Sequence, residues 1–159
     1  MAARLGRGVV ACAIAVATVV ATVLAMPSPV AADAQPGVSP TIAAEFIWAI
    51  EVVRSAHGLP GLVPDPSVSA AAQNWSGGMA LFHTLVHDSQ LGAVIAAVDP
   101  AWQAAGENIG TGPTPQSIEA AFIASPEHLA NMLGAYTHVG VGVFVDGSGQ
   151  IWVTERFYR

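Results

Sequence analysis

The sequence predicts an α+β fold, and three features of its pattern carry this prediction. Apolar residues recur every three or four positions from Thr41 to Ala56, which is the helical period. An acidic or hydroxyl residue precedes a proline at three later points, as at many helix starts. From His138 onward the pattern alternates with a period of two, as in a strand. Because helices come first and strands last, we expect helices that pack against a sheet.

The first 34 residues have the features of a secretory signal peptide. Two arginines precede Val9 to Met26, a stretch of 18 residues without a charged side chain, and a proline-rich exit leads to the expected cleavage point after Ala34, with Ala32 as the alternative. An uncleaved anchor is the other interpretation, because about 18 apolar residues just span a bilayer. Alanine and valine are weak anchoring residues, so we expect cleavage, secretion and no stable membrane insertion afterwards.

The mature chain would be a single domain of 125 residues, with residues 35–40 as a short tail and 41–159 as the domain. The only cysteine, Cys12, lies near the start of the apolar stretch and away from the cleavage point, so we expect neither lipidation nor disulfides. Ten acidic residues against three arginines, with no lysine, give the mature chain a net charge of −7. This charge disfavours nucleic acid and polyanionic membranes as partners.

Capping residues place the helices in chain order. The first helix covers Thr41 to Ala56, and an extended connector over 59–64 leads to the second, which begins at Asp65-Pro66 and runs toward Phe82. Gly77-Gly78 would cost this helix about 1 kcal/mol per glycine relative to alanine, so we expect another element to pack closely there. Thr114-Pro115 and Ser125-Pro126 begin two short helices, and another short helix or turn is expected over 90–98; the two later helices cover 116–123 and 127–133.

The strands are expected at the C-terminal end of the chain. His138 to Val145 and Gln150 to Phe157 alternate in polarity and are joined by Asp146-Gly147-Ser148-Gly149, which predicts a β-hairpin. A brief third strand is expected between Gly106 and Gly112. The tryptophans are spread over different elements and are predicted to be core residues; they are Trp48, Trp75, Trp102 and Trp152.

Histidines and one glutamate are the candidates for chemistry. A lone histidine is more often structural than a ligand, and this applies to each of His57, His83, His87, His128 and His138 taken singly. Glu107 lies among glycines in Gly106-Glu107-Asn108-Ile109-Gly110, where it is either a site residue or a turn residue. The chain contains no His-Glu-x-x-His helix and no Gly-x-Ser-x-Gly elbow, and its mature part has no cysteine nucleophile.

Five short motifs nevertheless occur in one order. They are Arg54-x3-Gly58-Leu59-Pro60-x-Leu62-x2-Asp65, His87, Gly106-Glu107-Asn108-Ile109, Ser125-Pro126-x-His128-x2-Asn131-x-Leu133, and Thr137-His138-Val139-Gly140-Val141-Gly142. In this order they resemble the CAP superfamily of cysteine-rich secretory, antigen 5 and pathogenesis-related 1 proteins, and in particular its short bacterial branch, the SCP domains. The resemblance covers Thr41 to Phe157. It implies a three-layer α-β-α sandwich, with a small antiparallel sheet between helices and a cleft above it.

The resemblance also implies a site in this cleft. His87 and His128 match two cleft histidines and Glu107 matches the first acid, a set that can surround zinc or another divalent metal and lower the pKa of a bound water. Ser125 stands where the family carries a second acid. Glu127 is the possible substitute, although on a helix it would point about 100° away from His128. His83, four residues before His87, is the rival for the first ligand.

These observations lead to three functional hypotheses. The leading one is a secreted, non-enzymatic binding module whose cleft or surface takes a lipid, a sterol-like molecule or another small apolar ligand. The second is a metal-dependent hydrolase of extracellular peptides or esters that uses His87, His128 and the candidate catalytic Glu107. The third is an envelope-associated interaction protein without a small ligand.

Overall fold

The computed structural model describes residues 36–159, so the predicted signal peptide and both cleavage points lie outside the described residues. Five helices and five strands make up this part of the chain. The helices are α1 (Pro40–Ala56), α2 (Pro66–Phe82), α3 (Leu91–Val98), α4 (Pro115–Ala124) and α5 (Pro126–Met132). The strands are β1 (Gly37–Val38), β2 (Val63–Pro64), β3 (Ala105–Gly112), β4 (His138–Val145) and β5 (Ile151–Tyr158). The α+β prediction is confirmed.

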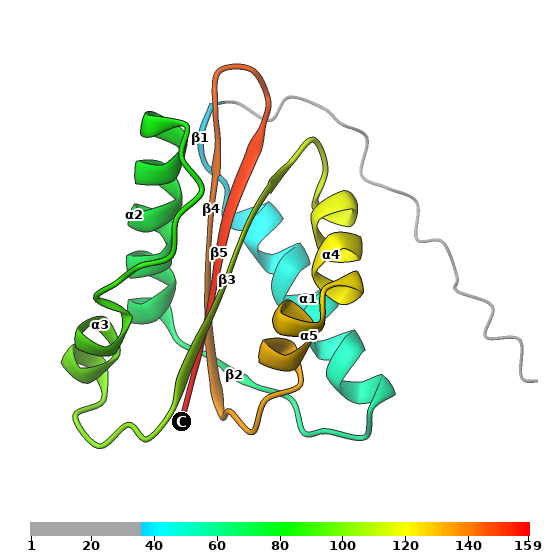
Figure 1. Ribbon diagram of the computed structural model, residues 1–159, viewed down its shortest axis with the longest axis vertical. Coiled ribbons are helices and arrows are strands. Elements are labelled where there is room, and N and C mark those ends of the chain that lie inside the picture. Colours follow the sequence, from blue (N-terminus) through cyan, green and yellow to red (C-terminus); the bar gives the residue numbers. More distant parts are fainter. Residues whose placement is uncertain (1–35) are drawn as a thin grey trace, which may run out of the picture. The chain divides into compact units, whose positions relative to one another are not determined.

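The elements form three layers, with the sheet in the middle (Figure 1). The strand order is β1-β4-β5-β3, and β2 also pairs with β4. Helices α2 and α3 cover one face of the sheet, and α1, α4 and α5 cover the other (Figure 1). The long strands pair antiparallel, whereas the two-residue β2 pairs parallel to β4. The predicted third strand is therefore present as β3, and the segment expected as a tail contributes β1 to the sheet edge.

At two of the three expected helix starts, the expected residue caps the helix with a side-chain hydrogen bond. The Asp65 carboxylate accepts hydrogen bonds from the Ser67 and Val68 amides at 2.8 and 3.0 Å, and Thr114 Oγ1 accepts one from the Ser117 amide at 3.1 Å. Ser125 differs, because it occupies the first position before α5 without making a side-chain cap hydrogen bond to that helix.

Helix α2 lies directly on β4, and strand glycines make this possible. A Cβ added at Gly140 would come within 2.6 Å of the Ser69 backbone nitrogen, and one added at Gly142 would collide with the backbone of α2. The helix glycines contribute less. A Cβ added at Gly77 would lie 3.6 Å from the Phe144 ring, an ordinary packing distance, and one added at Gly78 would meet nothing within 4 Å. The prediction that another element packs closely on these two glycines is therefore wrong.

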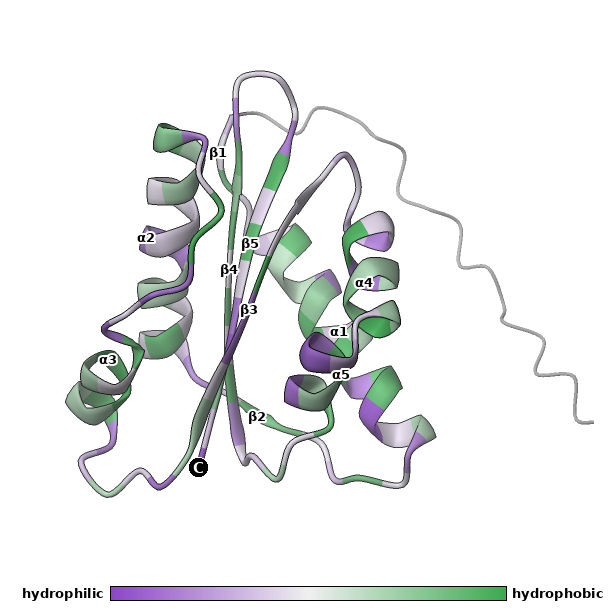
Figure 2. Cartoon of the chain, viewed as in Figure 1, coloured by the Kyte–Doolittle hydropathy of each residue, from purple (hydrophilic) through white to green (hydrophobic). Residues whose placement is uncertain are grey.

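The core lies on both faces of the sheet. Phe46 and Ile50 of α1 are fully buried against β4 and β5, and Met79 and Ala80 of α2 pack against Trp152 on the other face. Figure 2 shows hydrophobic segments in all three layers, including the last turn of α2. No helix among residues 36–159 is long and apolar enough to cross a membrane.

The prediction that all four tryptophans are core residues is only partly right. Trp152 is 6% exposed, but Trp48 is 58% exposed and the prediction is wrong for it. Trp48 follows the buried Phe46 by two residues, a rotation of about 200° around a helix, so it points away from the sheet. Trp75 and Trp102 are half-buried.

Candidate functional site

Glu107 is the centre of the candidate site, and the sheet holds it in place. It lies on β3, directly opposite Arg156 of β5 in the antiparallel register. Its carboxylate is buried, and Oε2 accepts a hydrogen bond from Arg156 Nε at 3.0 Å. Burying a carboxylate without a partner would cost several kcal/mol, so this ion pair is what allows Glu107 to lie inside the fold.

Arg156 joins two acids at once. A second guanidinium nitrogen, Nη2, donates to Asp88 Oδ2 at 2.7 Å, and the side chains of both Arg156 and Asp88 are almost fully buried. The guanidinium also lies 5.9 Å from the centre of the Trp75 ring, a distance at which a cation is attracted to an aromatic face. Arg156 thereby ties β3, β5 and the segment between α2 and α3 into one charged network.

His87 is the exposed end of this network. Its Nδ1 lies 3.0 Å from Glu107 Oε1, which also accepts a hydrogen bond from the Asp88 amide at 2.9 Å. The His87 side chain is 62% exposed, whereas that of Glu107 is 3% exposed. A buried, charged anchor therefore fixes one nitrogen of a solvent-facing imidazole and leaves the other nitrogen, Nε2, free to bind.

Helix α5 is tied to the same strand by two asparagines. Asn131 Nδ2 donates to the Glu107 carbonyl at 3.1 Å and to Asn108 Oδ1 at 2.9 Å. Asn108 Nδ2 donates to the His128 carbonyl at 3.2 Å. Gly106 permits this approach, since a Cβ there would lie 2.7 Å from Asn131 Oδ1. The Gly-Glu-Asn motif thus combines the site acid with the contacts that position α5.

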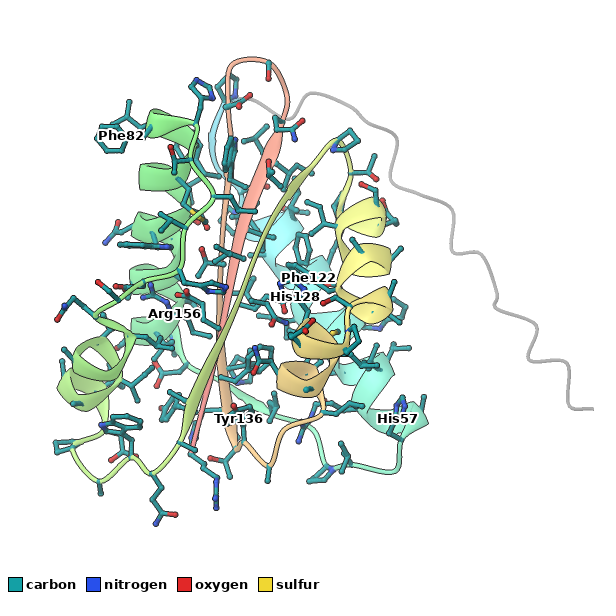
Figure 3. The ribbon with its side chains drawn as sticks, in the orientation of Figure 1. His57, Phe82, Phe122, His128, Tyr136 and Arg156 are labelled. Atoms are coloured by element: carbon teal, nitrogen blue, oxygen red, sulfur yellow. The ribbon has the colours of Figure 1, made fainter. Side chains whose placement is uncertain are left out.

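His128 lies on α5, within electrostatic range of His87. Burial lowers the pKa of His128, and the positive charge of protonated His87 lowers it further, against a smaller opposing effect of Glu127. Its Nδ1 is buried and has no hydrogen-bond partner among residues 36–159. The ring lies against Phe122, with the two ring centres 4.8 Å apart (Figure 3). His128 is therefore a neutral imidazole at neutral pH, and no hydrogen bond from the described chain fixes its ring.

The other candidates lie outside this network. Ser125 Oγ donates to Glu127 Oε2 at 3.1 Å on the exposed surface of α5, and the described residues give neither side chain a hydrogen bond to His87 or Glu107. Glu127 is exposed on α5. His83, the rival of His87, adopts a left-handed conformation with φ of 47° at the end of α2 and lies against the Trp152 ring. The hydrogen bond to Glu107 is made by His87.

The family resemblance predicts His87, His128 and Glu107 as the metal ligands. Residues 36–159 contain no group of three or more His, Cys, Asp or Glu side chains that could hold a metal ion. Both carboxylate oxygens of Glu107 take part in hydrogen bonds, Oε1 with His87 and the Asp88 amide and Oε2 with Arg156. Glu107 instead orients the His87 imidazole, as carboxylates behind ligating histidines do at many zinc sites.

Sequence reasoning missed four charged residues inside the fold. Arg156 and Asp88 complete the network around Glu107, and neither lies in a motif that predicts such a role. Glu119 of α4 and Glu155 of β5 form a second buried acid pair, in which Asn108 Nδ2 donates to Glu155 Oε2 at 3.0 Å. The available signal was the adjacent pair Glu155-Arg156 inside a strand, because two successive strand residues face opposite sides of the sheet and both charges need partners if helices cover both faces.

The comparison with protein families decides the classification. The family described as CAP, the cysteine-rich secretory protein family, matches residues 49–157. This chain belongs to that family. The match includes His87, Glu107 and His128 as well as Arg156, so every member of the network described above lies within the family domain. Among curated proteins, none matches the chain.

Solved structures show the same CAP fold in bacterial proteins. An outer surface protein from Borrelia burgdorferi is similar over 79% of this chain and 98% of its own, with a TM-score of 0.69 and 14% identity. An extracellular SCP-domain protein from Bacillus anthracis is 27% identical over 74% of this chain, with a TM-score of 0.62. A cysteine-rich secretory protein from Staphylococcus aureus has a TM-score of 0.62 and 17% identity over 80% of this chain. The chain covers 40% of the length of each of the latter two proteins.

Proposed function

We propose that this CAP protein is an exported, non-enzymatic binding module that holds a divalent metal ion, such as zinc, between His87 and His128. The observation that carries the proposal is the hydrogen bond between His87 Nδ1 and the buried carboxylate of Glu107. When Nδ1 of the neutral imidazole donates this hydrogen bond, Nε2 carries no proton and its lone pair can bind a metal ion.

The second ligand is supported by electrostatics. A metal ion competes with protons for an imidazole, and the lowered pKa of His128 reduces this competition at neutral pH. A bound metal would supply Lewis acidity at this position, while Glu107 and Arg156 hold His87 in place.

Binding without turnover is favoured by what surrounds His87. The acid that a hydrolase would use as its base, Glu107, has both oxygens occupied by His87, Asp88 and Arg156. Export is supported by the leader-like composition of residues 1–34 and by two neighbours that are described as an outer surface protein and an extracellular protein. A lipid or sterol-like ligand, as the family resemblance implies, is part of this proposal; exposed apolar side chains at Leu85 and Val86 lie next to His87 in the chain.

Calorimetric titration with zinc tests the metal site. Protein is purified from the culture medium of an expressing host, and its intact mass gives the N-terminus, which we expect at Gln35. Wild type, His83→Ala, His87→Ala and His128→Ala are then titrated at pH 7.5 and pH 5.5. We expect the zinc affinity of His87→Ala and of His128→Ala to fall at least tenfold. The affinity of His83→Ala should equal that of wild type.

The pH series provides an independent check. Protonated imidazole cannot ligate, so the affinity of wild type should fall at pH 5.5, below the ordinary histidine pKa of about 6.5. Unchanged zinc binding in both His87→Ala and His128→Ala would refute the metal site. Recovery of the full-length chain alone, in the membrane fraction, would refute cleavage and release.

A further inference from the structure

The segment at the end of α2 displays an unusual amount of apolar surface. Leu81 and Phe82 are 73% and 75% exposed, and Leu85 and Val86 are 48% and 50% exposed. Phe82 projects outward from the end of the helix (Figure 3). We call residues Leu81 to Val86 the apolar tip. A contiguous exposed apolar patch on a soluble protein often marks an interaction site, whereas single exposed apolar side chains are ordinary.

The shape of the apolar tip is fixed by hydrogen bonds. The Thr84 amide donates to the Met79 carbonyl at 3.1 Å, and Thr84 Oγ1 donates to the Phe82 carbonyl at 3.0 Å. Trp75 Nε1 donates to the Val86 carbonyl at 2.9 Å. Because the backbone is already ordered, burial of these side chains against a partner would cost little further conformational entropy.

The chemistry of the apolar tip favours an uncharged lipid surface. Residues 81–86 contain no Asp, Glu, Lys or Arg. The mature chain carries a net charge of −7 and no lysine, so anionic headgroups would repel it. Moving leucine, phenylalanine and valine side chains from water into the boundary between headgroups and acyl chains lowers the free energy. This transfer needs no specific pocket.

We infer that the apolar tip docks the exported domain onto the surface of a bilayer with uncharged headgroups. Phe82 and Leu85 enter the interface, while the sheet and the α1 layer stay in water. This inference rests on the proposed export and is independent of the metal site.

Vesicle co-sedimentation tests the inference. Protein from the culture medium is mixed with phosphatidylcholine vesicles, and the double variant Phe82→Ser/Leu85→Ser is compared with wild type. Trp48→Ser is the matched control, because Trp48 is a large apolar side chain with 58% exposure on α1, in the opposite helical layer. We expect the double variant to lose vesicle affinity at least tenfold and Trp48→Ser to bind like wild type.

Three further measurements separate docking from other effects of the variants. Thermal melts establish that the variants fold, and zinc titration of the double variant should match wild type, which separates this surface from the metal site. In Phe82→Trp, the added indole should shift its fluorescence to shorter wavelength when vesicles are added. Absence of wild-type binding to phosphatidylcholine, equal binding by the double variant, or a wild-type dimer that the double variant converts to monomer without any vesicle binding would overturn the inference.

Discussion

At the scale of single residues, Arg156 decides whether the site can exist. Its guanidinium bonds to Glu107 and Asp88 at 3.0 and 2.7 Å, and all three side chains are buried. Two buried carboxylates near each other repel, and neither has water to compensate. The cation is therefore the residue that makes the acidic side of the site compatible with a folded chain.

Replacement of this cation should destabilise the domain strongly. We expect Arg156→Met to lower the free energy of unfolding by roughly 3–5 kcal/mol, because it leaves Glu107 and Asp88 buried without their partner. Arg159→Met is the matched control, since Arg159 is exposed, and it should change stability by less than about 0.5 kcal/mol. Urea unfolding of both variants at pH 7 measures the difference. Equal stability of the two variants would mean that the buried network is not what holds Glu107 in place.

The residues of the site were predictable to different degrees. His87, Glu107 and His128 follow from motif order, because the family resemblance gives each of them a position. Arg156 and Asp88 do not, since the sequence shows only an arginine within an alternating strand and an acid after a histidine. Their roles depend on a pairing of β3 with β5 that joins residues 49 positions apart.

At the scale of elements, the packing of α2 against β4 depends on absent side chains. Gly142 leaves no room for a Cβ against the helix backbone, while a Cβ added at Gly78 on the helix would meet nothing within 4 Å. Backbone atoms cannot move aside as a flexible side chain can. The two glycines should therefore respond in opposite ways to the same substitution.

Alanine at these two positions gives a matched test. Gly142→Ala should destabilise the domain by about 3 kcal/mol or more, because the added methyl forces α2 away from the sheet. Gly78→Ala should stabilise it by about 0.5–1 kcal/mol through helix propensity alone. Thermal melts or urea unfolding compare them directly. A stabilising Gly142→Ala would contradict the close approach of α2 and β4.

The elements themselves were largely predictable, and the exceptions have a physical cause. Caps and periodicity identify the helices and the hairpin because these signals are local. The alternating polarity of β5 suggests one exposed face, yet all eight of its residues are buried, including Thr154, Glu155 and Arg156. A central strand with helices on both faces buries both sets of side chains, and a local pattern does not report the second layer.

At the scale of the whole molecule, one buried acid pair links the α4 layer to the sheet. Glu119 of α4 and Glu155 of β5 are both buried, and neither oxygen of Glu119 has a hydrogen-bond partner among residues 36–159. Burial raises the pKa of Glu119 to about 7. Burial, together with the neighbouring Glu119, raises the pKa of Glu155 well above its ordinary value. At mildly acidic pH the pair is protonated and neutral, which is the state that a dry interface between α4 and β5 tolerates.

This pair should make the folded state less stable as the pH rises from about 5 to 7. An unfolded Glu119 releases its proton near its ordinary pKa of 4.5, whereas the folded one keeps it until about pH 7. Between these values the folded state binds more protons, so the free energy of unfolding falls with rising pH, by roughly 3 kcal/mol in total for this residue. The lowered pKa of His128 acts in the opposite sense below about pH 6.5, so a variant is needed to isolate the acid pair.

Glu119→Gln isolates the pair because it keeps a hydrogen-bonding group beside Glu155 and removes the proton that Glu119 would release. Urea unfolding at pH 5, 6, 7 and 8 should show wild type losing stability relative to Glu119→Gln as the pH rises, with the difference complete above pH 7. Glu127→Gln, the same substitution on an exposed glutamate, should follow the wild-type profile. A constant difference between wild type and Glu119→Gln across this range would show that the carboxyl pair does not change its protonation there, and that α4 rests on the sheet by apolar packing alone.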